Sequence, residues 1–236
     1  MTSTNTKIIK RTGLTEPVNY KSADDVFNAV VNDLGNENIR TQLIAGDRQS
    51  GVSTTLMRVL GEIVYRSGAS DKPLTIGVVM SNVTLHRDRW VEYLNGDNHI
   101  SLKRKSGTST YVDGYSGSTI YFSSGTLHAI QAQRYDVIVI DQVDYVQNKI
   151  VEYACTGLFA TNVIMGATPS TGYITDKEND DQYFNVSRSY LFEPKHNANA
   201  IRYMLAWGYD EMGKEYPNLI RKIFSDYAEQ HKDENQ

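Results

Sequence analysis

Cysteine is nearly absent from this sequence: Cys155 is the only one in 236 residues. A single thiol excludes an internal disulfide and a zinc site made of several cysteines, and its apolar surroundings favour a plain buried thiol. No apolar run approaches the roughly 20 residues of a membrane-spanning helix, and the polar N-terminus has no signal-peptide core. We therefore expect a soluble, intracellular protein that is not secreted and has no membrane partner.

An excess of positive charge is also missing. The 24 Lys and Arg are outnumbered by 28 Asp and Glu, which leaves a formal net charge of -4. A protein with this balance has no overall attraction for nucleic acid, so any contact requires a local basic patch. Basic runs as short as those present are more often a solvated face, and salt-sensitive phosphate contact is the alternative. The candidate nucleic-acid residues are Arg87, Arg89, Lys103, Arg104 and Lys105.

Short apolar segments alternate with amphipathic ones along most of the chain. The apolar segments have the length of buried strands, and the amphipathic ones repeat their apolar residues at helical spacing. This alternation predicts an α/β fold, with a mainly parallel sheet and helices on both faces. The expected strands are 41–45, 74–80, 135–141 and 162–166, and the expected helices are 22–34, 53–66, 84–94 and 145–158.

Two of these helices carry more detailed predictions. Ser22 and Asp25 form a capping box that should start the first helix. In helix 84–94 we expect four residues to face the core: Leu85, Trp90, Val91 and Leu94. The basic residues of that helix, together with His86, should point outward.

The rest of the chain completes a single expected domain over 1–236. The hairpin is predicted from two strand-like runs that flank a glycine-rich turn, and the last helix from its amphipathic pattern. The expectations are an irregular segment at 1–20, a hairpin of 111–113 with 118–122, a polar loop at 172–182, a late strand at 201–207, a helix at 217–230 and a frayed tail at 231–236.

A glycine-bounded loop between the first expected strand and helix carries the strongest functional signal. Phosphate-binding loops follow the pattern G-x-x-x-x-G-K-[ST] in this context. Gly46, Gly51 and Ser53 are in register, but Val52 takes the lysine position. The backbone N–H groups can still attract phosphate, and Ser53 can still reach Mg²⁺. The candidate nucleotide-binding residues are Gly46, Asp47, Arg48, Gln49, Ser50, Gly51, Val52, Ser53 and Thr54.

The strand expected at 135–141 ends in a carboxylate suited to the same site. In P-loop ATPases, an Asp at this point holds the Mg²⁺ shell and a following Glu polarises the attacking water. Here Asp141 is followed by Gln142, which can orient water but cannot accept a proton, and Asp144 is a candidate substitute. Asp141 alone is better explained as a strand-end carboxylate that caps the next turn. With the 46–54 loop we favour Mg²⁺ coordination, and we expect Ser53 and Asp141 to lie close together.

A third loop of interest follows the strand expected at 162–166. Gly166, Ala167, Thr168 and Pro169 form a small-residue turn, and helicase-like ATPases use such a turn to couple hydrolysis to movement. An ordinary strand-to-loop turn is the alternative. Because parallel strands place their carboxyl ends at one edge, the loops 46–53, 141–144 and 166–170 should meet there.

These residues resemble those of one known family. The run from Arg48 to Thr54 resembles the R-Q-x-G-K-[ST]-T loop of bacteriophage terminase large subunits. Asp141-Gln142 stands where those proteins carry Asp-Glu, and the turn 166–169 resembles their coupling motif, with Ala167 and Thr168 as its candidate residues. The resemblance covers roughly 40–210, and it implies that the α/β fold is of the helicase- and terminase-like P-loop NTPase class.

The resemblance implies an ATP-driven motor that packages viral DNA in the host cytoplasm. It implies ATP or ADP and Mg²⁺ as cofactors, a catalytic role for Arg48, and double-stranded DNA, portal, small terminase or other motor subunits as partners, with a possible homo-oligomer. Val52 and Gln142 depart from the family pattern, and too little chain follows residue 170 for the family's nuclease domain. We therefore expect weak or no ATP hydrolysis.

Three hypotheses remain open from the sequence. The first is a terminase-type ATPase domain with active or residual hydrolysis. The second is a pseudo-ATPase that docks on a true motor, portal or nucleic acid. The third is an unrelated α/β binding protein whose loop imitates a P-loop. Nucleotide binding with Mg²⁺ and the order of the strands discriminate among them.

Overall fold

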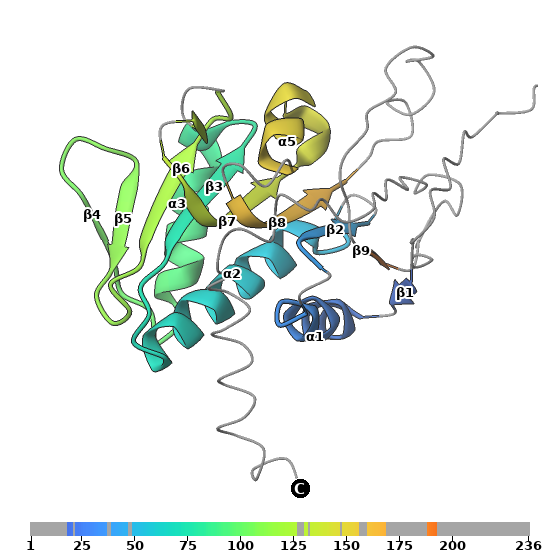
Figure 1. The fold of residues 1–236 in the computed structure, drawn as a ribbon, viewed down its shortest axis with the longest axis horizontal. Helices are drawn as coiled ribbons and strands as arrows, with labels where there is room; N and C mark the ends of the chain where they lie inside the picture. The colour runs from blue at the N-terminus through green and yellow to red at the C-terminus, as the bar shows by residue number, and fades with distance from the viewer. Residues whose placement is uncertain are drawn as a thin grey trace, which may run out of the picture.

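The computed structural model describes an α/β framework between residues 18 and 168 and one further strand near residue 190 (Figure 1). The expected loop at 172–182, strand at 201–207, helix at 217–230 and tail at 231–236 lie outside the described residues. The residues that the structure describes are 18–20, 22–36, 39–46, 49–126, 130–131, 133–146, 148–155, 160–168 and 188–192.

Helices and strands alternate as the apolar pattern predicts. The strands are β1 (Val18–Tyr20), β2 (Thr41–Ala45), β3 (Thr75–Met80), β4 (Leu102–Arg104), β5 (Thr110–Asp113), β6 (Thr119–Ser123), β7 (Tyr135–Asp141), β8 (Ala160–Ala167) and β9 (Arg188–Phe192). The helices are α1 (Ala23–Asp33), α2 (Val52–Ala69), α3 (Val83–Asn95) and α5 (Asn148–Cys155), with a 3-10 turn η1 (Val143–Tyr145).

All the described strands belong to one sheet, in the order β1-β9-β2-β8-β7-β3-β6-β5-β4. Within the described residues, only the β4–β5 and β5–β6 pairs are antiparallel, and all other neighbours run parallel. The prediction of a mainly parallel sheet is therefore confirmed. β8 lies between β2 and β7, so the two strands that lead into the candidate site are one strand apart.

Alternate residues of the central strands face two separate cores. Val137 and Val139 of β7 pack into the core beneath α1, α2 and α3, whereas Ile138 and Ile140 pack into the core beneath α5. Figure 1 shows α5 on one side of the sheet and α1 and α2 on the other. Because both faces of these strands are buried, their sequences are continuous apolar runs. The expectation of helices on both faces is confirmed.

The first helix begins where its capping box predicts. The Ser22 hydroxyl accepts a hydrogen bond from the backbone N–H of Asp25 at 3.1 Å and donates one to the Asp25 carboxylate at 2.7 Å. β2 and β7 also begin and end at the predicted residues. The hairpin of 111–113 with 118–122 is confirmed as β5 and β6, which pair in antiparallel register.

Several sequence predictions about elements are wrong. Within the segment expected to be irregular, residues 18–20 form β1, and neither β4 nor β9 was expected. The helix expected at 145–158 begins later than predicted: α5 starts at Asn148, and Tyr145 belongs to the preceding 3-10 turn η1. β4 and β1 are only three residues long, and such short strands carry little periodic signal because they exist through pairing with a neighbour.

The assignment of Leu85 to the core is also wrong. Trp90 and Leu94 are buried as predicted, but Leu85 is 69% exposed. Leu85 lies in the first turn of α3 and lines an open cavity instead of packing into the core.

A buried polar network joins α1 to β2 and β9. The Tyr190 hydroxyl donates to the Asp33 carboxylate at 2.7 Å, and the Gln42 amide donates to the Tyr190 oxygen at 2.7 Å and to the carbonyl of Val30 at 3.0 Å. Arg188 adds an ion pair to Asp33 at 3.1 Å. Burial raises the pKa of the Tyr190 hydroxyl, and the neighbouring Asp33 carboxylate raises it further. This network holds β9 in place beside the strand that precedes the P-loop.

Among the described residues, no helix combines the length and apolar character that a bilayer crossing needs.

Candidate nucleotide-binding site

The loop between β2 and α2 has the backbone conformation that its glycines allow. Gly51 has φ of 101° at the N-terminus of α2, and Gln49 has φ of 69°. A Cβ atom on Gly46 would collide with the Ser50 hydroxyl, so the loop closes tightly over this position. Asp47 and Arg48 lie outside the described residues, and the expected orientation of Arg48 therefore stays a prediction. The described part of the loop runs from the buried end of β2 directly into an 18-residue helix.

Ser53 and Asp141 come together at the carboxyl edge of the sheet. The Ser53 hydroxyl donates to Asp141 Oδ1 at 2.8 Å, although the two residues are 88 positions apart in sequence. This contact follows from the sheet order, because β2 and β7 both end at this edge with only β8 between them. The sequence-based expectation that these two side chains lie close together is confirmed.

The Asp141 carboxyl group is buried, with only 4% of the residue exposed. Burial raises its pKa because the charged form loses hydration. Opposing this shift, the Ser53 hydrogen bond, the nearby His86 and hydrogen bonds from Trp90 and the backbone of Gln142 lower the pKa. An ionised carboxylate that is buried from water lowers the stability of the folded protein unless a cation lies beside it.

Val52 occupies the lysine position of the P-loop, and its side chain is buried, with 2% of the residue exposed. One of its methyl groups lies against Gly166 of β8, since a Cβ atom built there would be 2.8 Å from Val52 Cγ1. The same residue lines the cavity next to Ser53. Val52 thus contributes apolar packing at the position where the usual P-loop presents a charge.

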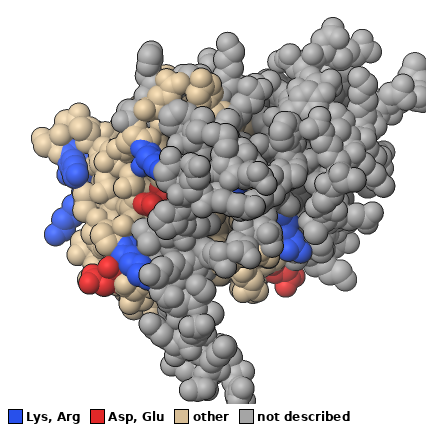
Figure 2. Space-filling model, viewed as in Figure 1, with Lys and Arg blue, Asp and Glu red and all other residues tan. Residues whose placement is uncertain are grey.

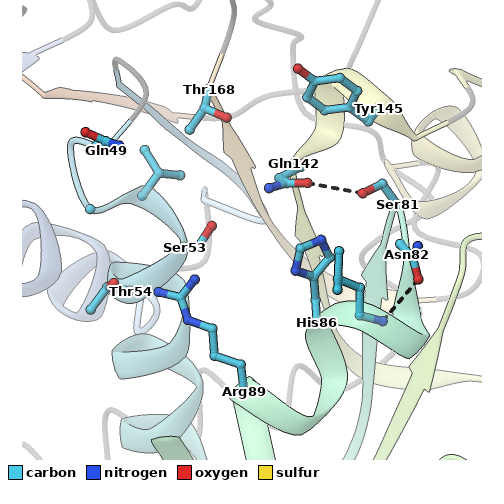
Figure 3. Close-up of a pocket in the computed structure, with 13 residues that line it drawn as sticks. Gln49, Ser53, Thr54, Ser81, Asn82, His86, Arg89, Gln142, Tyr145 and Thr168 are labelled. Carbon is cyan, nitrogen blue, oxygen red and sulfur yellow. Dashed lines mark hydrogen bonds between the residues drawn. The ribbon is translucent and has the colours of Figure 1, made fainter.

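Gln142 has the left-handed backbone conformation, with φ of 56° and ψ of 56°. Such a conformation is uncommon outside glycine and costs energy, so the surrounding contacts must hold it. Its amide oxygen accepts a hydrogen bond from the Ser81 hydroxyl at 3.1 Å (Figure 3). Gln142 faces the cavity from the end of β7. Asp144 belongs to η1, and its side chain lies outside the described residues.

The end of β8 contacts the start of the P-loop. The backbone N–H of Gly46 donates to the carbonyl of Ala167 at 3.2 Å, and Thr168 lines the cavity. Pro169 lies outside the described residues. The candidate coupling residues Ala167 and Thr168 therefore bridge the P-loop and the cavity, as expected if the three loops meet at one edge.

A cavity of about 740 Å³ opens between the start of α2, the start of α3 and the ends of β7 and β8. Its size lies within the range of small-molecule sites. Figure 3 shows Arg89 and His86 reaching into it from α3, opposite Gln49 and Thr54 of the P-loop side. The lining residues are Gln49, Gly51, Val52, Ser53, Thr54, Ser81, Asn82, Leu85, His86, Arg89, Gln142, Tyr145 and Thr168.

The candidate nucleic-acid residues fall into two places. Arg89 lines the cavity. Arg87 turns the other way, toward Asp88 at 2.8 Å and the Ser109 hydroxyl at 3.4 Å. Lys103 and its two basic neighbours lie on and just after the edge strand β4. Figure 2 shows Lys and Arg in small separate groups, without a continuous basic area among the described residues of that face.

The residues present fit a Mg²⁺–nucleotide complex in part. Oxygen atoms are the ligands that Mg²⁺ prefers, and it is usually bound by one or two carboxylates together with substrate phosphates and water. Ser53 and Asp141 supply a hydroxyl and a carboxylate that already contact each other. In the described part of the chain, no group of three or more His, Cys, Asp or Glu could hold a metal ion without the phosphates.

Known proteins resemble this chain in structure more than in sequence. No protein-family model matches the sequence, and no curated protein matches it. Among solved structures, the large terminase from a thermophilic bacteriophage is similar in one crystal form with a TM-score of 0.49 and 12% sequence identity, covering 74% of this chain and 48% of that one.

Two further structures of the same phage's large terminase are similar, one of them in complex with ADP. Both have a TM-score of 0.46 and 12% identity, and each match covers 70% of this chain. The match covers 44% of the terminase chain in the ADP complex and 43% of the terminase chain in the other structure. This chain therefore spans less than half the length of these terminase structures.

Proposed function

We propose that this chain is a terminase-like P-loop ATPase domain that acts in viral DNA packaging and hydrolyses ATP weakly or not at all by itself. The observation that carries this proposal is the 2.8 Å contact between Ser53 and Asp141. A hydroxyl from the start of a P-loop helix and a carboxylate from the end of a second parallel strand are the two protein groups that a Mg²⁺–nucleotide site requires.

Each residue has a defined part in this proposal. The first N–H groups of α2 bind phosphate oxygens, because a helix N-terminus carries a partial positive charge. Ser53 and Asp141 hold the Mg²⁺ shell, and bound Mg²⁺ neutralises charge on the phosphates. Gln142 orients water but cannot remove its proton. Arg48, and Asp144 as a substitute base, keep the catalytic roles proposed from the sequence. Ala167 and Thr168 couple the site to movement.

Two departures from the P-loop ATPase pattern, Val52 and Gln142, support weak ATP hydrolysis. Electrostatic stabilisation of the transferring phosphoryl group is usually the largest catalytic contribution, and Val52 offers methyl groups in the place of an ammonium. The Gln142 amide oxygen is already engaged by Ser81. Double-stranded DNA, the portal and other packaging subunits are the partners that the sequence resemblance implies.

A pseudo-ATPase that docks on a motor, portal or nucleic acid is the second candidate. The burial of Val52 favours it, because this side chain serves the packing between α2 and β8. This candidate predicts no turnover and a stable complex with a partner.

Nucleotide titration with Mg²⁺ tests the site directly. We expect weak ADP binding by the full chain, with micromolar to millimolar affinity. Asp141→Ala and Ser53→Ala should weaken the Mg²⁺-dependent part about tenfold or more, because each removes a charged or polar ligand. Isothermal titration calorimetry with and without Mg²⁺ measures the ADP affinity and the part of it that depends on Mg²⁺. Absence of any nucleotide binding by the wild-type chain contradicts the proposal.

Phosphate release tests the expected weakness of hydrolysis. The wild-type chain should release little or no phosphate, and the double change Val52→Lys with Gln142→Glu should raise nucleotide affinity and give some turnover. Steady-state release by the wild-type chain that Asp141→Ala abolishes would show that the site is active, with another cation in the place of the lysine.

A further inference from the structure

The cavity beside the P-loop has an unusual charge for this protein. The whole chain carries more acids than bases, yet none of the thirteen described residues that line the cavity is Asp or Glu. Arg89 is the permanently charged residue among them. Asp141, 4% exposed, lies next to Ser53 but is not part of the described lining. A cavity whose described lining carries an arginine and no carboxylate favours an anionic ligand.

Arg89 differs from four other arginines of the described chain. Arg58, Arg66, Arg87 and Arg188 each form an ion pair with a carboxylate, at distances of 2.6 to 3.1 Å. Arg89 forms none with any described residue. Its side chain is exposed, and Figure 3 shows the guanidinium group directed toward Ser53 and Thr54, at the start of α2.

The fold explains why α3 delivers a charge to this point. β3 pairs with β7 so that Met80 lies opposite Asp141, and the chain then turns through Ser81 and Asn82 into α3. The Asn82 side chain caps the helix by accepting from the N–H of Leu85 at 3.1 Å. Trp90 is 1% exposed and anchors the helix against the core. The residue before Trp90 is therefore held at the cavity wall.

From this arrangement we infer that Arg89 is the phosphate-binding cation of the site, supplied by α3 in place of the lysine that Val52 replaces. The inference rests on the proposed nucleotide site and names the group that grips its polyphosphate. A guanidinium is always charged and binds two phosphate oxygens through its planar fork. The N–H groups at the start of α2 face the same cavity.

The chemical class of ligand follows from these groups. One guanidinium beside one helix N-terminus fits adjacent phosphates, as in a nucleoside di- or triphosphate, better than a single carboxylate. Ser53 and Thr54, in the first turn of α2, add hydroxyl groups to the lining of the cavity. Arg89 contacts the ligand, so its role is binding and charge neutralisation rather than positioning of another residue.

Titration of the full chain with ADP and with inorganic tripolyphosphate tests the inference by binding alone. Arg89→Ala should weaken both ligands about 10- to 100-fold, because a hydrogen-bonded charge pair is lost. Arg89→Lys should retain part of the affinity. Arg66→Ala removes the same charge at the far end of α2, where Arg66 pairs with Glu62, and should leave both affinities unchanged. Thermal unfolding of each variant confirms that it is folded.

A rescue variant locates the effect. In the Arg89→Ala background, Val52→Lys should recover phosphate affinity, since either cation serves the same cavity. Wild-type-like binding of ADP by Arg89→Ala overturns the inference but leaves the proposed nucleotide site standing. Failure of the wild-type chain to bind either ligand overturns both. Loss of DNA affinity with unchanged ADP affinity in Arg89→Ala also overturns the inference, and makes Arg89 a nucleic-acid contact.

Discussion

At the scale of single residues, Asp141 combines a cost to folding with a proposed role in holding Mg²⁺. Its carboxyl group is buried, and burial is the largest cause of its raised pKa. A folded-state pKa above the unfolded value of about 3.8 means that the folded protein binds the proton more tightly. The stabilising contribution is present below pH ~3.8 and is lost as the pH rises through the folded pKa. At neutral pH the ionised group therefore destabilises the free protein.

This reasoning predicts that Asp141→Asn stabilises the free chain at pH 7 to 8. The amide keeps one acceptor oxygen for Ser53 and removes the buried charge. Each pKa unit of the shift corresponds to about 1.4 kcal/mol, and about 1 kcal/mol raises the melting temperature by roughly 2 to 4 °C in a chain of this size. The gain should shrink as the pH falls toward 4. Thermal unfolding across this pH range measures it.

The control for this experiment is Asp71→Asn, at an exposed turn after α2, which should change the melting temperature little at any pH. If Asp141→Asn is less stable than the wild type at pH 8, the cost of the buried charge is outweighed by its hydrogen bonds. If the increase in melting temperature of Asp141→Asn is as large at low pH as at pH 8, its cause is not the ionisation of Asp141.

At the scale of elements, the contact between β8 and the start of α2 sets the geometry of the P-loop. Gly166 lies opposite Ile44 of β2 and directly beneath two side chains of α2. A Cβ atom at this position would be 2.6 Å from Leu56 Cδ1 and 2.8 Å from Val52 Cγ1. The absence of a side chain on Gly166 lets the helix approach the sheet, and Val52 fills the remaining space.

We predict that Gly166→Ala destabilises the chain and weakens nucleotide binding together. Overpacking of a buried contact typically costs about 1 to 3 kcal/mol, and relief of the clash requires α2 to move away from β8 at the end that carries Ser53. Urea unfolding measures the stability, and ADP titration measures the site.

Gly61→Ala is the matched substitution within α2. The nearest atoms to its added Cβ are 3.6 Å away, and alanine favours the helix by up to about 1 kcal/mol over glycine. This variant should be at least as stable as the wild type and should bind nucleotide normally. If Gly61→Ala and Gly166→Ala lose equal amounts of stability and of nucleotide affinity, the close contact of α2 with Gly166 is not what sets the geometry of the loop.

At the scale of the whole molecule, charge limits how the chain meets DNA. A net charge of -4 gives no general attraction, so a contact requires a local basic group, and the residues around β4 form one candidate group. Lys103 and Lys105 are exposed there and form no ion pair with any described residue, whereas Arg104 donates to the carbonyl of Thr108 at 2.8 Å. Lysines on an edge strand also prevent edge-to-edge association, which is the alternative role for these residues.

We predict that the full chain binds double-stranded DNA weakly and that the affinity falls steeply with salt. Lys103→Ala with Lys105→Ala should reduce the slope of log affinity against log salt by about 2, since each phosphate contact contributes about 0.9. Fluorescence anisotropy from about 50 to 200 mM salt measures the slope. Arg66→Ala serves as the control. A slope that the double variant leaves unchanged, or a rise in self-association, would favour the edge-protection role.

Local patterns in the sequence determined much of the framework. The apolar runs of β2 and β7, the capping box of α1 and the glycines at 46 and 51 each act through their own neighbours in the chain. Burial on both faces requires an apolar run, and a tight loop requires glycine, so these features are visible without any tertiary structure. The same patterns placed Ser53 and Asp141 at one edge, because the carboxyl ends of parallel strands meet there.

Only the tertiary structure decided which distant segments pair and where side chains at the ends of elements point. The sequence contains no local signal that β9 lies beside β2, because this pairing depends on the network of Tyr190 with Gln42 and Asp33. Likewise, helical periodicity assigned Leu85 to the core, yet Leu85 is 69% exposed and lines the cavity. Arg89 is exposed as predicted, but only the tertiary structure shows that it lines the same cavity. Periodicity records which face of a helix is apolar, whereas the packing of the whole chain decides what that face meets.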